Sequence, residues 1–434
     1  MKLRPFELGL IIFFVILAIG ALVLLTNPPQ RSGDDEGLPV IGQVNIWGTL
    51  PSNQVRSLID SISDVDDRYE NVTYSYLQAR DLEDRLVNAI AAGSGPDLVL
   101  YSHEQLVEIR RWLQPISYES FPQRDIRNIY IAGASIFALN DGLYARPVAV
   151  NPMVMYWNRD ILTNAGYLTP PATWEELVNS VLPDLIERDS ARNIQRSVVA
   201  MGEYDNIRRS FGILSTLILQ GGSSGVATGA DGNYQIALNQ GVDGTAPMSA
   251  ALNFYTRFSR AENAWYSWNR SFSEDRERFL SGDLVFYFGF VTEAREIERA
   301  NPNLNFDIAE MPQDANASVR RTYGNFYGYS LMRTSRNPVG ARAVMDNLAS
   351  VNNSNTLATS YGLVPVYINL VAAGSNDIYG RLAYSTAPVT YGWLSPNRLA
   401  TDQVFEIMVE DVISNRRGVD SAVRDALQRL GQEY

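Results

Sequence analysis

Hydrophobic positions recur alternately at strand and helix spacings along most of the chain. The apolar run 44–47 predicts a buried strand. Four apolar positions at helical spacing follow Ser52, namely Val55, Leu58, Ile59 and Ile62. They predict a helix that Ser52 caps at its N-terminus. Alternating Val72, Tyr74 and Tyr76 then predict a second strand.

The alternation of strands and helices continues after this second strand. Leu82, Leu86 and Ile90 share one face of a predicted helix that ends at Gly93. The apolar strand 98–100 follows, so the order of elements is βαβαβ. This order predicts a mostly parallel sheet, because parallel neighbours need a helical crossover between them. We therefore expect an α/β protein.

A second alternating region lies further along the chain, with apolar runs at 148–150 and 153–157. Signals for helix starts recur after it. Thr173 and Glu176 have the spacing of a capping box, and Asn337 before Pro338 places a capping side chain ahead of a proline at the first helical position. The tail ends in two predicted helices.

The first residues of the chain have a different pattern. The uncharged apolar run 8–25 suits a bilayer core of roughly 30 Å at about 1.5 Å rise per residue. Lys2 and Arg4 precede this run, and Asp34 and Asp35 follow it. The excess of basic residues before the run predicts a cytoplasmic N-terminus, with the remainder of the chain outside the membrane.

We therefore predict an N-terminal transmembrane anchor at 1–26, followed by a flexible linker at 27–42 that is rich in Pro, Gly and charge. A cleaved signal peptide is the alternative interpretation of the same segment. The anchor is favoured because the apolar run exceeds the usual signal-peptide core and no clear A-x-A cleavage site follows it.

Composition and charge exclude several classes of function. The 434 residues carry a formal net charge of -12, which disfavours a nucleic-acid partner. The absence of Cys removes disulfides and thiol catalysis, and the single His103 is a poor basis for a metal site. We predict no metal, no cofactor and no catalytic residues. The acidic groups at 64–67 and 293–298 are expected on solvated helix faces.

Several longer motifs occur in a fixed order: NIWG at 45–48, RLVNAIAAGSGPDLVLYSHEQ at 85–105, RPVAVNPMVMYWNRDILTNAGYLTPPATWEEL at 146–177, FLSGDLVFYFG at 279–289 and YGLVPVY at 361–367. On these motifs, the chain from about Val44 onward resembles the family 1 extracellular solute-binding proteins of ABC importers. The periplasmic maltose-binding protein is the best-known member of that family.

The resemblance implies a two-lobed periplasmic-binding-protein type II fold with a hinge, preceded here by the transmembrane helix. Lobe 1 would comprise 43–150 with 302–350, and lobe 2 would comprise 151–301 with 351–434. The chain would cross between lobes near Val150–Asn151, near Asn301–Pro302 and just after Ser350. The ligand would bind between the lobes, and hinge closure would follow from its contacts with both of them.

The resemblance also implies ligand-binding positions. Tyr101 falls where the maltose-binding member has a sugar-contacting aromatic residue. Glu104 and Gln105 fall where that protein uses a carboxylate and an Arg, and Asn151 falls where it uses a Glu. Thr292 aligns near the family's aromatic platform. Because two charged contacts become amides, maltose itself is not the expected ligand.

Sugars present C–H faces and hydroxyl edges, so their sites combine aromatic rings with amides and carboxylates. We assign further aromatic residues to the site from strand ends and Gly-flanked segments that are expected to be loops: Trp47, Trp268, Phe290, Phe326, Tyr327 and Trp393.

The sequence thus predicts a monomeric, membrane-tethered, extracytoplasmic solute-binding protein that captures a small polar ligand. A carbohydrate is the first expectation for that ligand, and an ABC permease is the expected membrane partner. One alternative is a ligand-sensing or scaffolding domain without transport. A glycoside hydrolase is a second alternative, because Asp and Glu pairs are abundant.

Overall fold

The computed structural model describes residues 41–229, 233–317 and 319–434. The predicted anchor at 1–26 and all but the last two residues of the predicted linker lie outside these ranges. Among the described residues, no helix combines the length and the apolar character that crossing a membrane requires.

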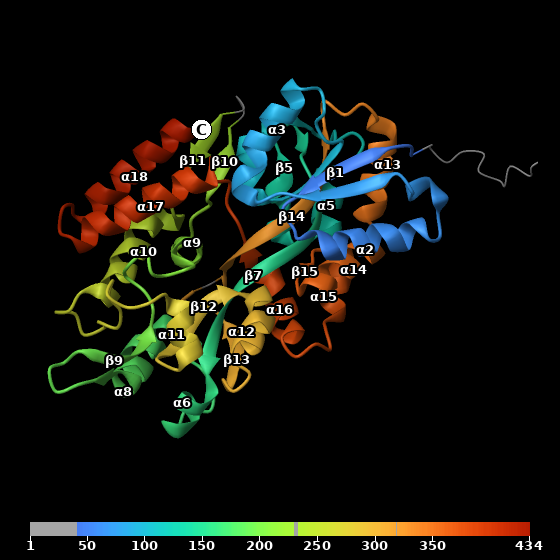
Figure 1. The fold of residues 1–434 in the computed structure, drawn as a ribbon. Helices are drawn as coiled ribbons and strands as arrows, with labels where there is room; N and C mark the ends of the chain where they lie inside the picture. The colour runs from blue at the N-terminus through green and yellow to red at the C-terminus, as the bar shows by residue number, and fades with distance from the viewer. Residues whose placement is uncertain (1–40, 230–232, 318) are drawn as a thin grey trace, which may run out of the picture. The chain divides into compact units, whose positions relative to one another are not determined.

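A sheet of 12 strands runs through the protein, and its main path has the order β2-β1-β3-β14-β7-β12-β9-β8 (Figure 1). The strands of this path are β1 (Val44–Gly48), β2 (Val72–Tyr76), β3 (Leu98–Ser102), β7 (Arg146–Asn158), β8 (Glu187–Arg188), β9 (Ile194–Val199), β12 (Leu284–Phe290) and β14 (Thr322–Met332). The strands off this path are β4 (Leu113–Gln114), β13 (Phe306–Glu310), β15 (Val364–Pro365) and β16 (Thr390–Tyr391). Two separate hairpins are β5 (Ala138–Leu139) with β6 (Gly142–Leu143), and β10 (Val226–Thr228) with β11 (Tyr234–Ile236).

The predicted parallel arrangement is confirmed at the start of the sheet, but the expectation of a mostly parallel sheet is wrong, because β14 pairs antiparallel with β3 and β7, and β7 pairs antiparallel with β12. β1 pairs in parallel with both β2 and β3. The helix α2 (Ser52–Ser63) buries the four apolar residues that the spacing selected. Ser52 is the first residue of this helix and does not cap it; Pro51 holds the cap position. The helix α3 (Leu82–Ala91) follows β2, and Gly93 after it has φ +67°, the left-handed conformation that favours glycine.

β7 joins the two sides of the sheet. The two predicted runs at 148–150 and 153–157 form one strand of 13 residues. Its N-terminal part pairs with β14, whereas its C-terminal part pairs with β12 and β13. We call β2, β1, β3, β14 and the N-terminal part of β7 the first sheet half. The second sheet half is the C-terminal part of β7 with β12, β13, β9 and β8.

Two crossings between the sheet halves lie later in the chain than the resemblance implied. β13 still pairs with the C-terminal part of β7, so the return to the first half follows β13 and does not occur at Asn301–Pro302. After Ser350, α14 (Val351–Tyr361) packs against α2 and β7 and stays with the first half. The chain reaches the second half again before α17 (Arg398–Ile413), which packs against α18 (Val419–Glu433).

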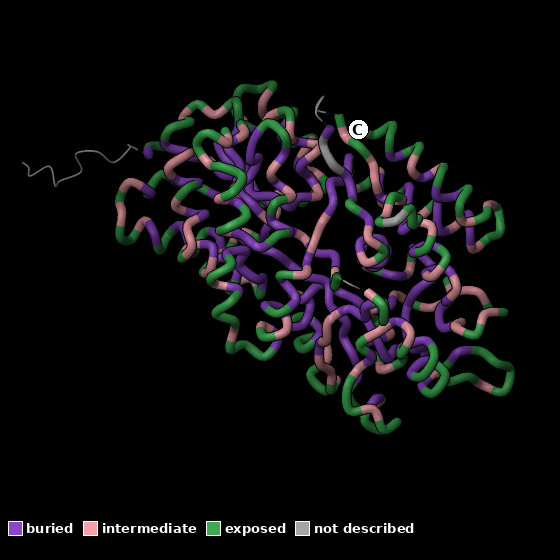
Figure 2. Tube along the Cα trace, turned by 180° about the vertical axis from the view of Figure 1, so that it is seen from behind, coloured by how far each residue is buried: buried purple, intermediate pink, exposed green. Residues whose placement is uncertain are grey.

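The remaining helices cover the sheet, and buried residues concentrate along the central strands (Figure 2). The remaining helices are α4 (Leu106–Ile109), α5 (Gln123–Ile129), α6 (Arg159–Asn164), α7 (Trp174–Glu176), α8 (Leu182–Leu185), α9 (Ser210–Gln220), α10 (Pro247–Thr256), α11 (Asp275–Ser281), α12 (Ala294–Ala300), α13 (Pro338–Leu348), α15 (Ile368–Ala373) and α16 (Gly380–Thr386).

Two predicted helix caps are confirmed. The Thr173 hydroxyl accepts the N–H of Glu176, and the Asn337 side chain accepts the N–H of Gly340.

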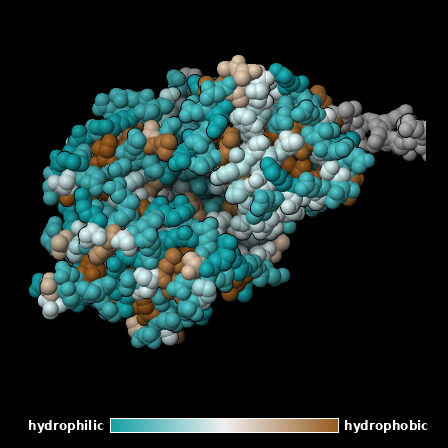
Figure 3. Space-filling model, in the orientation of Figure 1, coloured by the Kyte–Doolittle hydropathy of each residue, from teal (hydrophilic) through white to brown (hydrophobic). Residues whose placement is uncertain are grey.

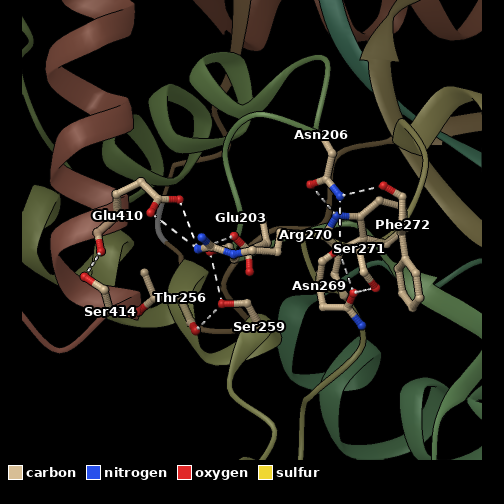
Figure 4. A network of polar contacts seen from close by, with 12 residues as sticks. Glu203, Asn206, Thr256, Ser259, Asn269, Arg270, Ser271, Phe272, Glu410 and Ser414 are labelled. Atoms are coloured by element: carbon tan, nitrogen blue, oxygen red, sulfur yellow. Dashed lines mark hydrogen bonds and ion pairs between the residues drawn. The ribbon is translucent and has the colours of Figure 1, made fainter.

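A polar network fixes α17 to the second sheet half (Figure 4). Arg270 Nη2 lies 3.3 Å from Glu203 Oε2 and 3.2 Å from Glu410 Oε1. Glu203 follows β9, and Glu410 belongs to α17. The Asn206 amide supports the Arg270 loop by donating to the carbonyl of Asn269 at 2.9 Å. The orientation of α17 is therefore tied to this half.

An aromatic cluster forms part of the core of the second half. Phe279 is fully buried, and its ring centroid lies 5.9 Å from that of Tyr287 and 6.4 Å from that of Tyr156. We expect Phe279→Ala to lower the free energy of unfolding by about 3–5 kcal/mol, because it removes a large buried ring and leaves a cavity. Urea unfolding measures this change.

Leu168 provides the matched control, because it is 85% exposed and its removal opens no cavity. Leu168→Ala should change the stability by less than about 0.5 kcal/mol. Equal effects of the two substitutions would contradict the placement of Phe279 in the core.

His103, the single histidine, is buried directly after β3. Its Nδ1 accepts the backbone N–H of Phe326 at 3.2 Å. A Cβ at Gly392 would lie 2.4 Å from its Nε2, so only glycine fits beside the ring. Burial lowers the pKa of His103 to about 4. The Glu104 charge acts to raise this pKa, and the Arg398 charge acts to lower it. The imidazole is therefore neutral at physiological pH and has a structural role.

We expect the C2 proton resonance of His103 to show no titration between pH 8 and about 5.5. Because its folded-state pKa lies below that of an exposed histidine, protonation favours unfolding. Its contribution to stability is lost as the pH falls from about 6.5 towards 4. NMR on protein without a histidine tag measures this directly, and a midpoint near 6.5 would refute the burial argument.

Candidate functional site

A cavity of about 750 Å³ lies between the two sheet halves. Figure 3 shows the surface hollowed near the middle of one face, with mostly hydrophilic residues around the hollow. The polar and aromatic residues that line the cavity include Gln54, Asn151, Thr292, Tyr327, Ser360, Tyr361, Tyr379 and Tyr384. Charged residues line it as well: Arg295, Glu296, Arg299 and Asp377.

The sheet topology explains where this cavity forms. Leu50 and Gln54 follow the carboxyl end of β1, and Thr292 follows the carboxyl end of β12. In open α/β sheets, the carboxyl ends of the strands are where loops leave a crevice for a ligand. The cavity therefore combines the carboxyl ends of the two sheet halves.

Asn151 and Thr292 form a hydrogen-bonded pair on the cavity wall. Asn151 Nδ2 donates to Thr292 Oγ1 at 3.0 Å, and the Thr292 N–H donates to Asn151 Oδ1 at 3.4 Å. Asn151 lies at the midpoint of β7, where the strand passes from one half to the other. An amide has two donor hydrogens and two acceptor lone pairs, so both groups retain hydrogen-bonding capacity for a ligand.

A buried ion pair lies at the carboxyl end of β12. Arg209 Nε is 2.8 Å from Glu293 Oε1, and the Tyr287 hydroxyl donates to Glu293 Oε2 at 2.6 Å. Burial acts to raise the pKa of Glu293, but the Arg209 charge and the hydrogen bonds overcome it, so this pKa lies below its usual value. The expectation of a solvated face at Glu293 is wrong, because its side chain is only 3% exposed.

Three of the predicted site residues line the cavity, whereas Glu104 and Phe290 are not part of its lining. Asn151, Thr292 and Tyr327 line it. Glu104 has a 12% exposed side chain, and its Oε1 accepts the hydroxyl of Tyr323 at 2.7 Å. The Phe290 ring lies under the Arg209 guanidinium, with 5.1 Å between the guanidinium carbon and the ring centroid.

Three other predicted site residues, Tyr101, Trp268 and Phe326, are fully buried among side chains of the core. Ser330 Oγ donates to the Tyr101 hydroxyl at 3.1 Å. Trp268 Nε1 donates to Asn206 Oδ1 at 2.9 Å. The Phe326 ring packs against His103 at 6.1 Å between centroids. These side chains have packing roles here, and their assignment as ligand contacts stays a prediction.

Gln105, Trp393 and Trp47 also make internal contacts. Gln105 Oε1 accepts the N–H of Ser102 at 3.1 Å, which completes a capping box. Trp393 is 2% exposed, and its Nε1 donates to Ser215 Oγ at 3.1 Å. Trp47 is half-buried within β1. Phe326 and Tyr327, expected on a Gly-flanked loop, lie within β14 instead.

Three residues that contact predicted site residues carry no signal in the sequence: Arg209, Arg398 and Phe211. Arg209 and Glu293 are 84 positions apart, and no local spacing connects them. Basic residues are dispersed through the chain, so nothing distinguished these two arginines from those on the surface. Only the packing at the starts of α9 and α17 brings these side chains next to Phe290, Trp393 and Glu104.

Comparisons with solved structures support this architecture. A cyclo/maltodextrin-binding protein complexed with maltotetraose superposes with a TM-score of 0.71 at 17% identity, over 92% of this chain and 98% of that one. The cyclic alpha-maltosyl-1,6-maltose binding protein from Arthrobacter globiformis gives a TM-score of 0.69 at 15% identity, over 90% and 98%. These likenesses confirm the predicted two-lobed periplasmic-binding-protein fold.

Curated proteins match a smaller share of this chain than the solved structures do. A binding protein of Brucella abortus strain 2308 is 22% identical over 290 residues, which are 65% of this chain and 65% of that protein. The match thus spans slightly less than two thirds of that relative's length. The maltotriose-binding protein of Pyrococcus abyssi is 26% identical over 138 residues, which are 31% of this chain and 29% of that protein.

A family model described as bacterial extracellular solute-binding protein matches residues 67–378, which is more than half of the chain. The resemblance inferred from the motifs is thereby confirmed. The family consists of binding proteins, and its members place their binding domain outside the cytoplasm. This chain belongs to the bacterial extracellular solute-binding proteins.

Proposed function

We propose that this protein captures a small carbohydrate in the cavity between its sheet halves and delivers it to an ABC permease. The observation that carries the proposal is the cavity itself, which joins the carboxyl ends of β1 and β12 and is lined by amides, hydroxyls and tyrosine rings. This combination suits a ligand with hydroxyl edges and C–H faces.

The size of the cavity and the ligands of similar proteins support a sugar. A volume of about 750 Å³ lies within the range of roughly 300–1,000 Å³ that small-molecule sites occupy. The names of similar proteins mention maltotetraose, maltotriose and tagatose. No catalytic role is proposed for the carboxylates at the site, because the charged pairs identified there join acids to arginines.

The shared strand supports a hinge mechanism. β7 runs from one sheet half into the other, so a small change in its backbone torsions would open or close the cavity. A ligand that contacts both halves favours the closed state by its additional contacts there. A monomer is sufficient for this mechanism, because one chain supplies both walls.

We expect isothermal titration of the full-length protein with maltotriose, maltotetraose and tagatose to show saturable binding of at least one sugar. Asn151→Ala and Tyr327→Ala should each weaken that binding by roughly tenfold or more, because each removes a hydrogen-bonding group from the cavity wall. Asn303→Ala, at an exposed position, is the control. Binding of amines or peptides but of no sugar would refute the carbohydrate assignment.

We further propose that the apolar run 8–25 anchors the protein in the cytoplasmic membrane with the binding lobes outside. The protein should resist extraction from membranes by alkaline carbonate, and deletion of residues 1–26 should release it. The intact mass of the membrane-bound protein should include the run. A mature chain that lacks these residues would show instead that the segment is a cleaved signal peptide.

A further inference from the structure

Arg398 lies at the start of α17, on the second sheet half. Asn397 caps this helix, and its side chain accepts the N–H of Ala400 at 2.9 Å. The Arg270 network fixes the same helix to β9 through Glu410. The Arg398 side chain is 28% exposed, so part of it remains accessible to solvent.

The side chain of Arg398 reaches the first sheet half. Its Nε lies 3.2 Å from Glu104 Oε1, and Glu104 directly follows β3. The Tyr323 hydroxyl donates to the same carboxylate oxygen at 2.7 Å. On its own helix, Arg398 Nη1 lies 2.8 Å from Asp402 Oδ1. The guanidinium therefore connects an acid of one half to an acid of the other.

Arg398 also covers an aromatic face. The guanidinium carbon lies 3.8 Å from the centroid of the Phe211 ring, close enough for direct stacking. A carboxylate beside an aromatic face is the pair of groups that a bound sugar ring uses for a hydroxyl and for its C–H face. Arg398 occupies both groups in this structure.

Two hydrogen bonds hold the same edge of the cleft together. Arg110 Nη1 donates to the Tyr234 hydroxyl at 3.2 Å, and Asn140 Nδ2 donates to the carbonyl of Gly229 at 2.6 Å. Arg110 and Asn140 belong to the first half, whereas β11 lies against α18 through the rings of Tyr234 and Tyr434, 5.0 Å apart. Neither hydrogen bond joins two charged groups, in contrast to the ion pair between Arg398 and Glu104.

We propose that Arg398 is an internal substitute for the ligand: it bridges the two sheet halves in the ligand-free protein, and a bound ligand displaces it from Glu104 and Phe211. The bridge that Arg398 makes between the sheet halves rests on the contacts of this chain alone. Only the identity of the displacing ligand rests on the proposed carbohydrate function.

The absence of cysteine allows a direct test. Spin labels are attached to Val87→Cys on α3 and Ser421→Cys on α18, two exposed positions on opposite halves, in the full-length protein. Electron–electron double resonance then measures the distance between the labels. Without ligand, Arg398→Gln should lengthen this distance and lower the ratio of closed to open molecules roughly tenfold, as the loss of a partly buried charged hydrogen bond implies.

A second variant and a control make this result interpretable. Glu104→Gln removes the same ion pair from the other half and should lengthen the distance as well. It also decides the test if Arg398→Gln does not fold. Arg429→Gln removes an ion pair with Asp425 within α18 and should leave the distance unchanged. The proposal is overturned if Arg398→Gln and Glu104→Gln both show the same distance between the labels as the labelled protein in which Arg398 and Glu104 are intact.

Adding maltotetraose separates this proposal from the carbohydrate assignment. If Arg398→Gln opens the ligand-free protein and maltotetraose closes it again, both hypotheses are supported. If the variant opens the protein but neither maltotetraose nor any other sugar restores the short distance, Arg398 remains the internal bridge and the carbohydrate assignment fails.

Discussion

The backbone pairing of β7 is the constraint on which the rest of the structure depends. This strand is buried along nearly its whole length, and it pairs with β14 and β15 at one end and with β12 and β13 at the other. Both sheet halves therefore share one strand, and the cavity forms where that strand changes partners. Asn151 lies at this point, because it pairs with Asn325 of β14 while β7 pairs with β12 from Met153 onward.

Acidic side chains in and near the cleft are paired with arginines, although the chain as a whole carries a net charge of -12. Glu293 meets Arg209, and Glu104 meets Arg398. A neutral, polar ligand can bind without disrupting these pairs, whereas an ionic ligand that took one partner would leave the other charge unpaired.

Much of the fold could be predicted from hydrophobic spacing. The buried face of α2 and the parallel order of β2, β1 and β3 depend on local periodicity and chain order, which the sequence displays directly. The site depends on tertiary partners instead. Tyr101 lies at a strand end, as ligand contacts often do, but Ser330 and Phe137 enclose it. Glu293 resembles a solvated helix residue until Arg209 is placed beside it.

We propose that the cavity between the sheet halves binds the solute. A crystal structure of the protein grown with maltotetraose tests this proposal most directly. We expect a sugar in the cavity, in contact with Asn151 and Tyr327, with the Arg398 guanidinium displaced from the Phe211 ring. A sugar bound outside this cavity, with Arg398 still on Phe211, would contradict it.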